Sequence, residues 1–254
     1  MMRHPKVPDG CHLIAHETIG STNAEARKRA EHGAVDRTVI WASEQTAGRG
    51  RHGRDWSSPP GNLYLSVVCR PDCAVSQAPQ LGFVVGVAMA GAIRALSDIP
   101  VVLKWPNDLL VDGRKVSGLL LESADDGHGR VAWVVAGIGV NVESHPETLA
   151  DTTDLRTLGA EFSVEDLIEV FLPRLFDLQD AWSRDGFAPI REQWNEHALS
   201  FGTAITVKMP DGVISGHFEG IDAAGNMAVR HDGRLVHVAA GDVFPLSSPA
   251  TGVS

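Results

Sequence analysis

The nine residues from Gly48 to Trp56 read GRGRHGRDW, and they place three arginines and three glycines in one short segment of a chain whose net charge is -10. Glycine allows backbone conformations and close approaches that other residues resist. Arginine presents a planar fork of donors that matches carboxylate and phosphate oxygens, and Trp56 adds a flat face on which a base could stack. These residue types at this spacing predict a loop that holds an anion.

Two phosphate-binding patterns match this segment in part, and the residues that follow argue against both. Residues 48–53 have the spacing G-x-G-x-x-G, but the dinucleotide-binding motif needs a helix to begin inside it. Residues 57–61 read SSPPG, so no helix is expected to start there. A P-loop needs Lys and then Ser or Thr after its last glycine, and this chain has Arg54 and Asp55. The segment is therefore interpreted as a ligand loop of another kind.

A second group of polar residues lies in the segment 104–122, which reads KWPNDLLVDGRKVSGLLLE. The pair Asp112-Gly113 between two apolar runs is a strong signal for a tight hairpin turn. A hairpin at this place would bring four polar side chains close together: Lys104, Asn107, Asp108 and Lys115.

Apolar and β-branched runs predict the strands that must position these groups. Strands are expected at residues 11–18, 38–43, 62–70, 101–105 and 131–142. The last of these is apolar throughout, which suggests burial on both faces. The polar Asn141 near its end is therefore conspicuous.

Helices are expected at residues 22–32, 77–97, 163–182 and 187–199. Thr22 and Glu25 have the spacing of a capping box at the start of the first helix. Helix N-termini hold anions and polar head groups, so Ser21, Thr22 and Asn23 are candidate ligand contacts as well as a simple cap. The helix at 77–97 is apolar enough to be buried. Pro173 is expected to kink the third helix or to split it in two.

From Thr203 onward the chain consists of short runs of strand-forming residues separated by turn signals, a pattern typical of a small antiparallel barrel. The boundary is expected near Phe201. The sequence therefore predicts an α+β protein with two domains. Residues 1–200 would form a mixed, mostly antiparallel sheet flanked by helices, and residues 201–254 a small SH3-like β-barrel.

Composition excludes several function classes. A chain of 254 residues that are 43% apolar can bury a sizeable core. Its acidic balance argues against DNA or an anionic membrane as the main partner. The three cysteines form no C-x-x-C pair, so neither a disulfide framework nor a zinc site is indicated and no metal ligands are assigned. With no apolar run of signal-peptide length in the first 20 residues, a cytoplasmic location is expected.

Four segments in this order resemble the biotin protein ligases: Ser21-Thr22-Asn23, Gln45 with the loop at 48–56, residues 104–122, and residues 137–142, which read GIGVNV. The resemblance implies a class II synthetase-like ligase domain. It implies an enzyme that uses ATP and Mg²⁺ to convert biotin to biotinyl-5′-adenylate, and then transfers biotin to a lysine of the biotin carboxyl carrier domain of a carboxylase such as acetyl-CoA carboxylase.

Some bacterial members of that family carry an amino-terminal DNA-binding domain. Here the first strand is expected about ten residues from Met1, so the resemblance points to the monofunctional type that lacks this domain. A monomer or a homodimer is expected.

The resemblance also implies roles for single residues. Lys115 and Arg51 would be catalytic, because they would bridge the biotin carboxylate and the α-phosphate of ATP. The other implied contacts fall into four groups. The biotin rings would be bound by Ser21, Thr22, Asn23 and Gln45, and the ligand would be wrapped by Gly48, Arg49, Gly50 and Arg51. Gly118 would allow a close backbone approach, and the nucleotide would be contacted by Arg54, Trp56, Asn107 and Asn141. Asp108 could orient Lys104 or Arg54, or place Mg²⁺ through water.

Two other functions stay open on the sequence. A lipoate or octanoate ligase would share the fold and the adenylate chemistry. A ureido ring needs hydrogen-bonding groups such as Ser21, Thr22 and Gln45, and a site with such groups rejects a ligand that leaves them unpaired, which favours biotin. The second is a nucleic-acid or protein binding module, in which the terminal barrel resembles small SH3-like folds and the arginine loop, residues 48–56, could touch RNA. The loop taken alone could also be a solvated basic turn. One basic loop on an acidic chain is a poor footprint for nucleic acid.

Overall fold

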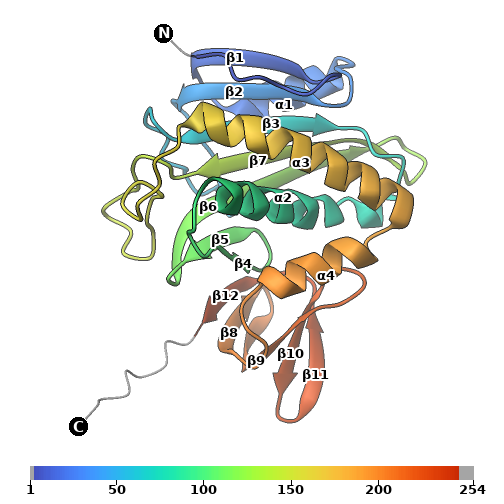
Figure 1. Ribbon diagram of the computed structural model, residues 1–254. Coiled ribbons are helices and arrows are strands. Elements are labelled where there is room, and N and C mark those ends of the chain that lie inside the picture. Colours follow the sequence, from blue (N-terminus) through green and yellow to red (C-terminus); the bar gives the residue numbers. More distant parts are fainter. Residues whose placement is uncertain (1–2, 246–254) are drawn as a thin grey trace.

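The computed structural model describes residues 3–245 and arranges them as two sheets with helices packed between and around them (Figure 1). The first sheet has seven strands in the order β1-β2-β3-β7-β6-β5-β4. Its strands are β1 His12–Ile19, β2 Thr38–Gln45, β3 Leu63–Cys69, β4 Val102–Lys104, β5 Asp108–Val111, β6 Arg114–Asp125 and β7 Val131–Val140. Strands β1 and β2 are parallel and the other neighbours are antiparallel, so the predicted mixed, mostly antiparallel sheet is confirmed.

Alternation of side chains along the strands gives this sheet two apolar faces with different helical covers. In β2, Val39 and Trp41 belong to one core and Ile40 belongs to the other. Helix α1 (Thr22–Glu31) covers the smaller core, whereas α2 (Gln80–Leu96) and α3 (Val164–Asp185) lie side by side over the larger one (Figure 1). The predicted α+β class, with a sheet flanked by helices, is therefore confirmed.

Helix α2 is buried because the first sheet, α3 and α4 all pack against it. Counted from Val75 to Leu96, this helical stretch is long and apolar enough to cross a membrane, but 72% of its apolar window is buried inside the protein. A helix that is covered on two sides must be apolar nearly all round. Its composition therefore reflects its place in the core, and the predicted buried helix is confirmed.

Pro173 does not divide helix α3, which runs unbroken for 22 residues. The prediction that it could split the helix was wrong. Proline removes the N–H that would bond the carbonyl of Glu169, but Pro173 is exposed, so solvent can reach this carbonyl. Packing on both sides of the proline holds the two halves in line, since it buries Phe171, Leu172, Leu175 and Phe176.

The second sheet has the order β11-β10-β9-β8-β12, and its neighbouring strands are antiparallel. Its strands are β8 Ala204–Met209, β9 Gly212–Ile221, β10 Met227–His231, β11 Arg234–Val238 and β12 Asp242–Pro245. The SH3-like form and the division into domains 1–200 and 201–254 stay predictions, and residues 246–254 lie outside the described part of the chain.

Helix α4 (Ala188–His197) and the start of the β4–β5 hairpin hold the two sheets together. The indole Nε1 of Trp105 donates to the carbonyl oxygen of Gly225 at 3.0 Å. Gly225 has φ +87°, and a Cβ at this position would lie 2.7 Å from the ring of Phe83, so only glycine fits the turn. Because Trp105 precedes Asn107 and Asp108, the second sheet helps to fix the segment that carries them.

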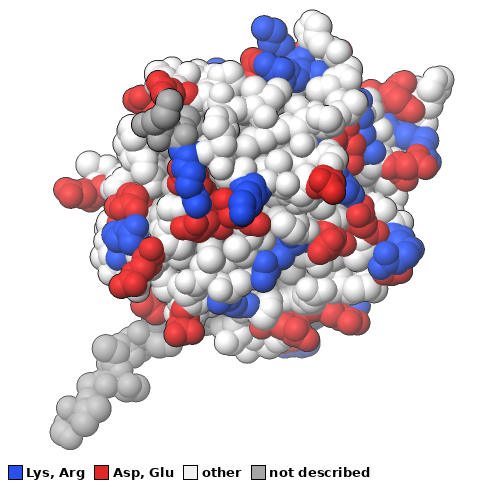
Figure 2. All heavy atoms as spheres, turned by 45° about the horizontal axis from the view of Figure 1, so that its top comes forward, with Lys and Arg blue, Asp and Glu red and all other residues white. Residues whose placement is uncertain are grey.

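Acidic and basic side chains are mixed on the face that Figure 2 shows. Several oppositely charged neighbours are paired, such as Arg29 with Glu25 and Arg230 with Glu219, each at 2.7 Å. Exposed pairs of this kind contribute little to stability. The face shown has no broad basic field of the kind that holds a nucleic-acid backbone.

Candidate functional site

A cavity of about 320 Å³ lies where the arginine loop, the N-terminus of α1, the hairpin β5–β6 and the end of β7 meet. The residues proposed from the sequence come together here: the cavity is lined by Ser21, Thr22, Asn23, Gln45, Arg49, Gly50, Arg51, Arg54, Trp56, Asn107, Lys115, Gly118 and Asn141. Asp108 lines it as well. The roles of these residues stay predictions, but they share one cavity although they come from segments more than 100 residues apart.

Gly48 is the one proposed residue that does not line this cavity. A Cβ at Gly48 would lie 2.4 Å from Ser58 Oγ and 2.5 Å from the carbonyl oxygen of Trp56. The backbone N–H of Trp56 donates to the carbonyl of Gly48 at 3.0 Å. Gly48 is therefore required for the loop to fold back on itself, and its place around a ligand stays a prediction.

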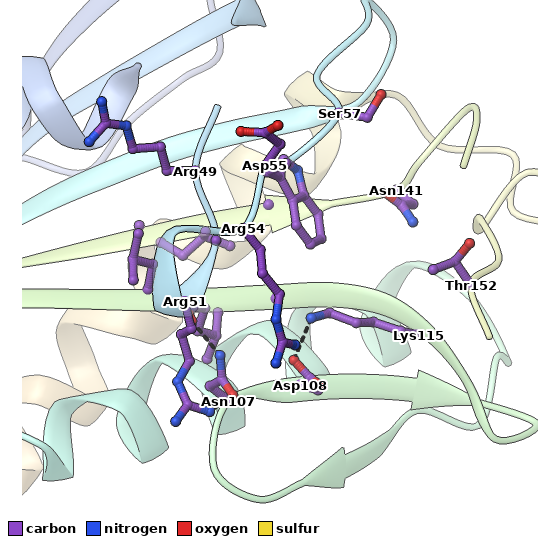
Figure 3. A pocket seen from close by; sticks show the side chains of 18 of the residues that line it. Arg49, Arg51, Arg54, Asp55, Ser57, Asn107, Asp108, Lys115, Asn141 and Thr152 are labelled. Atoms are coloured by element: carbon purple, nitrogen blue, oxygen red, sulfur yellow. Dashed lines mark hydrogen bonds and ion pairs between the residues drawn. The ribbon is translucent and has the colours of Figure 1, made fainter. Parts of the chain in front are cut away.

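The carboxylate of Asp108 lies between two lysines. Its Oδ1 is 2.6 Å from Nζ of Lys115 and its Oδ2 is 3.1 Å from Nζ of Lys104. Lys115 lines the cavity and, in Figure 3, extends to Asp108 from β6. One carboxylate between two ammonium groups leaves a net positive charge at this side of the cavity, so the first of the roles considered for Asp108, orienting Lys104, agrees with the geometry.

Asn107 links the arginine loop to this hairpin. Its Oδ1 accepts from Nη1 of Arg51 at 2.9 Å, and its Nδ2 donates to the carbonyl of Leu119 at 2.7 Å. Figure 3 shows Arg51 directed to Asn107, whereas Arg49 points away from both. In this conformation Arg51 is therefore held toward the hairpin by a neutral amide oxygen, which an anion could replace.

Asp242 of the second sheet holds the arginine loop from the other side. Its Oδ2 accepts from Nη2 of Arg54 at 2.6 Å, and its Oδ1 lies 3.8 Å from Nη1 of Arg51. Burial alone would raise the pKa of Asp242, but the hydrogen bond and charge of Arg54, with the charges of Arg51 and His52, outweigh burial and lower the pKa. The carboxylate is therefore ionised near neutral pH.

The substitution Asp242→Asn is expected to loosen the arginine loop. It removes the charge that attracts Arg54, whose side chain is 67% exposed, so the loss of global stability should be small, below about 1 kcal/mol. Trypsin should then cleave within residues 49–54 several times faster than in the unchanged protein. Asp232→Asn, which alters an exposed carboxylate outside the cavity, is the control. Equal cleavage rates in all three proteins would contradict the restraint.

Polar side chains at the start of α1 form a second group in the cavity. The capping box predicted for Thr22 and Glu25 was wrong, because Ser21 is the N-cap and its Oγ accepts from the backbone N–H of Ala24. Thr22 is engaged elsewhere: its backbone N–H donates to Oε1 of Gln45 at 2.8 Å, and its Oγ1 lies 3.1 Å from the same oxygen. Buried Thr22 and half-buried Gln45 therefore form one polar unit at the cavity wall.

The floor of the cavity consists of two glycines and an indole ring. A Cβ at Gly139 would lie 2.6 Å from Trp56 Cε2, and a Cβ at Gly118 would lie 3.0 Å from Trp56 Cζ3. Nζ of Lys115 is 5.3 Å from the centroid of this ring. Within residues 3–245 the buried Nε1 of Trp56 has no hydrogen-bond partner. The glycines allow the ring to lie flat on β6 and β7.

Asn141 joins the cavity to the segment that follows β7. Its Nδ2 donates to the carbonyl of Thr153 at 3.0 Å, and the backbone N–H of Thr153 donates to the carbonyl of Lys115 at 3.0 Å. These bonds fold the segment back over the cavity, where four of its residues form part of the wall: Pro146, Leu149, Asp151 and Thr152. Sequence analysis missed them because this stretch carries no periodic pattern or motif.

Other residues that line the cavity were also missed. Asp242 is separated from Arg54 by 188 positions, and no local signal connects them. Gly137 and Gly139 lie in the segment GIGVNV that was singled out, and their spacing of two could have been interpreted as one open face of a strand. The buried Ser66 of β3, which does not line the cavity but contacts Thr22 and Asn23 from behind its wall, had no signal beyond its place in an apolar run.

The arrangement can neutralise negative charge next to a polar pocket. Arg51, Arg54 and Lys115 line the same cavity as Thr22 and Gln45. One unit charge at about 4 Å from an anion contributes about 4 kcal/mol at an effective dielectric constant near 20. Three cations therefore favour chemistry in which two anionic groups must be brought together.

Comparison with known proteins gives matches along most of the chain. The Biotin/lipoate A/B protein ligase family matches residues 17–141, and the Biotin protein ligase C terminal domain matches residues 200–244. The biotin--[acetyl-CoA-carboxylase] ligase of Paracoccus denitrificans is 36% identical over 234 residues, which cover 88% of this chain and 96% of that protein.

Two solved structures are similar over nearly their whole length. The biotin protein ligase of Aquifex aeolicus in complex with biotin and ATP has a TM-score of 0.81 and 26% identity, with 92% of this chain and 99% of that chain covered. The biotin protein ligase of Leishmania major in complex with biotinyl-5-AMP has a TM-score of 0.63 and 26% identity, with 95% and 100% covered.

Proposed function

The chain belongs to the biotin protein ligase family, and we propose that it activates biotin with ATP and attaches it to one lysine of a biotin carboxyl carrier domain. The observation that supports this most directly is the single cavity that combines Arg51, Arg54 and Lys115 with Thr22 and Gln45. Relatives that carry biotin, ATP or biotinyl-5-AMP in the same fold agree with it. Acetyl-CoA carboxylase is the acceptor named for the Paracoccus enzyme.

In the first half-reaction the biotin carboxylate attacks the α-phosphorus of ATP. The new bond is an acyl–phosphate bond, and the bond to the β-phosphate breaks with release of pyrophosphate. Both reactants are anions, so positioning and fixed positive charge are the main contributions a protein can make. Lys115 and Arg51 bridge the carboxylate and the α-phosphate, while Arg54 contacts the nucleotide phosphates.

The polar unit at the start of α1 recognises the bicyclic ring of biotin. Buried Thr22 and half-buried Gln45 offer side-chain oxygens, and Ser21 offers a hydroxyl, in the same cavity. Trp56 stacks on adenine, and Asn107 and Asn141 contact the nucleotide. Arg49 and Gly50 close over the ligand. Gly118 allows the backbone of β6 to approach it, because a Cβ there would already meet Lys115 and Trp56 at 3.0 Å.

Mg²⁺ would be held by the phosphates of ATP rather than by a site on the protein. Among residues 3–245 no group of three or more His, Cys, Asp or Glu side chains is placed to hold a metal ion. The carboxylates nearest the cations are committed, since Asp108 pairs with two lysines and Asp242 with Arg54. Mg²⁺ commonly keeps several waters and binds through substrate phosphates, and when bound it would supply charge neutralisation there. Asp108 and Asp242 therefore act here as partners of cations.

In the second half-reaction the amine of the acceptor lysine attacks the acyl carbon, an amide bond forms and AMP leaves. Such an amine must reach the cavity past the segments that line it, among them the arginine loop and the segment 146–152. We propose a cytoplasmic enzyme that acts as a monomer or homodimer, with residues 201–254 as a separate domain that restrains the arginine loop through Asp242.

Biotin-dependent exchange of pyrophosphate into ATP is the experiment that tests this function. The unchanged protein should catalyse exchange with biotin, and exchange with lipoate or octanoate should be at least tenfold slower, because those acids have no ring N–H to donate to the remaining lone pairs of Thr22 and Gln45. Equal rates with lipoate would replace biotin by lipoate as the substrate. No exchange with any of these acids, together with salt-dependent nucleic-acid binding, would refute the ligase function.

A further inference from the structure

Ser66 of β3 lies behind the cavity wall and contacts two residues of α1. Its side chain is fully buried, and its Oγ is 2.8 Å from Thr22 Oγ1 and 2.7 Å from Asn23 Oδ1. Thr22 Oγ1 is in turn 3.1 Å from Gln45 Oε1. Each of these three oxygen–oxygen contacts needs one proton, and the two hydroxyl groups supply only two. The direction of the hydrogen bonds can therefore be worked out.

The orientation of the Gln45 amide is fixed by backbone groups. Its Oε1 accepts from the backbone N–H of Thr22 at 2.8 Å. Its Nε2 donates to Ser58 Oγ at 3.0 Å, and Ser58 passes its own proton to the carbonyl oxygen of Trp56 at 2.8 Å. The oxygen of Gln45 therefore faces Thr22, where it accepts and cannot donate.

The orientation of the Asn23 amide is fixed in the same way. Its Nδ2 donates to Oε2 of Glu122 at 2.9 Å and lies 3.4 Å from the carbonyl oxygen of Leu120. The amide is confined in a slot over Gly137, where a Cβ would lie only 2.0 Å from Asn23 Oδ1. Asn23 Oδ1 is therefore a buried acceptor, and Ser66 is the group that can give it a proton.

These constraints leave one favourable pattern. Ser66 donates to Asn23, so the contact between Ser66 and Thr22 takes its proton from Thr22. Gln45 Oε1 loses little by this, since it already accepts the backbone N–H of Thr22. Thr22 Oγ1 is then left with a free lone pair. Because Thr22 and Gln45 both line the cavity, they present acceptors and no hydroxyl donor to a ligand.

We propose that Ser66 is a positioning residue that sets ligand selectivity: by accepting the proton of Thr22 it keeps that proton from Gln45 Oε1 and from the ligand, so that the oxygens of Thr22 and Gln45 both stay free to accept. This inference rests on the proposed function. The N–H groups of a cyclic urea can donate to such oxygens, whereas a dithiolane ring or an alkyl chain has no N–H and leaves them unpaired. Asn23 belongs to the same unit, since its amide is used to orient Ser66 rather than to contact the ligand.

The substitution Ser66→Ala tests the inference. Thr22 should then donate to Gln45, which removes acceptor capacity from the cavity, so KM for biotin should rise about tenfold while kcat changes less than about twofold. The ratio of kcat/KM for biotin to that for lipoate, measured as AMP formation, should fall by a similar factor, and KM for ATP should stay unchanged. The matched control is Ser117→Ala, because Ser117 of β6 is equally buried but its Oγ has no partner within residues 3–245.

The outcomes separate this inference from the function on which it rests. An unchanged KM for biotin and an unchanged selectivity ratio in Ser66→Ala would overturn the inference alone. The same loss in Ser117→Ala would also overturn it, because a general packing effect would then be sufficient. If the unchanged protein forms no AMP with biotin, the proposed function is overturned and the inference with it. Should Ser66→Ala not fold, the second variant is Ser66→Cys, whose thiol is somewhat larger than a hydroxyl and is a weaker donor and acceptor. A smaller rise of KM is expected, and no rise would overturn the inference.

Discussion

Replacing Lys115 by alanine is expected to slow formation of biotinyl-5′-adenylate by about 100- to 1,000-fold, the range found when one preorganised charge-stabilising group is removed from an active site. The amine of Lys115 lies in the cavity and is placed by a 2.6 Å contact with Asp108. The side chain is 27% exposed, so unfolding free energy should change by about 1 kcal/mol or less. Single-turnover AMP formation and a thermal melt measure the two effects.

Lys104→Ala is the matched control for Lys115→Ala. Lys104 contacts the same carboxylate at 3.1 Å, but it does not line the cavity. Its removal should alter the rate by only a few-fold, because Asp108 keeps Lys115 as a partner. A near-normal rate in Lys115→Ala, or equal losses in the two variants, would refute the catalytic role of Lys115.

Replacing Arg51 by alanine is expected to lower kcat/KM for biotin by about 10- to 100-fold, which corresponds to the loss of about 1.5–3 kcal/mol for hydrogen bonds to charged groups. Arg51 is held by Asn107 at 2.9 Å and stands 3.8 Å from Asp242. An incoming anion can replace the neutral amide of Asn107 as the hydrogen-bond partner of the Arg51 guanidinium, and no strong ion pair has to break. Calorimetric titration with biotin and steady-state kinetics should both report the loss.

One further variant tests whether the shape of the Arg51 side chain matters, and another is the control for loss of an arginine elsewhere. Arg51→Lys keeps the charge but not the planar fork, so it should recover only part of the activity. Arg230→Ala removes an arginine that pairs with Glu219 on the second sheet and should be indistinguishable from the unchanged protein. Full activity in Arg51→Ala would show that the arginine loop acts through Arg54 alone.

Local sequence signals predicted the elements whose structure is set by neighbouring residues. The turn Asp112-Gly113 forms as expected, with φ +49° and +75°, because this dipeptide tolerates two left-handed residues. The arginine loop and the hairpin were found because unusual residue types were close together in the chain.

Local signals failed where tertiary contacts outweighed them. Thr22 has the spacing of a cap, but its hydroxyl is used by Ser66 and Gln45, so the adjacent Ser21 caps the helix instead. The proline of α3 was expected to kink the helix or to split it in two, and packing on both sides of it keeps the helix unbroken. Tertiary packing commonly decides such cases against local preference.

The residues that complete the site could not be predicted because sequence distance hides them. Arg54 meets Asp242, and Ser66 meets Thr22 and Asn23, only after the strands are ordered in the sheet. In an apolar strand, no sequence pattern shows whether a serine only fills space in the core or makes hydrogen bonds there. The strand order of the first sheet, β1-β2-β3-β7-β6-β5-β4, was not foreseen either.

Because Trp105 donates a hydrogen bond to the carbonyl of Gly225, the two sheets should unfold together on heating. If the second sheet unfolded first, the indole N–H of Trp105 would lose its hydrogen-bond partner. The rings of Phe83 and Trp194, which pack against the second sheet, would become exposed to solvent. Such a half-melted form should be too costly to accumulate. Differential scanning calorimetry should therefore show one unfolding transition for the whole chain. A protein truncated after residue 200 should tend to aggregate.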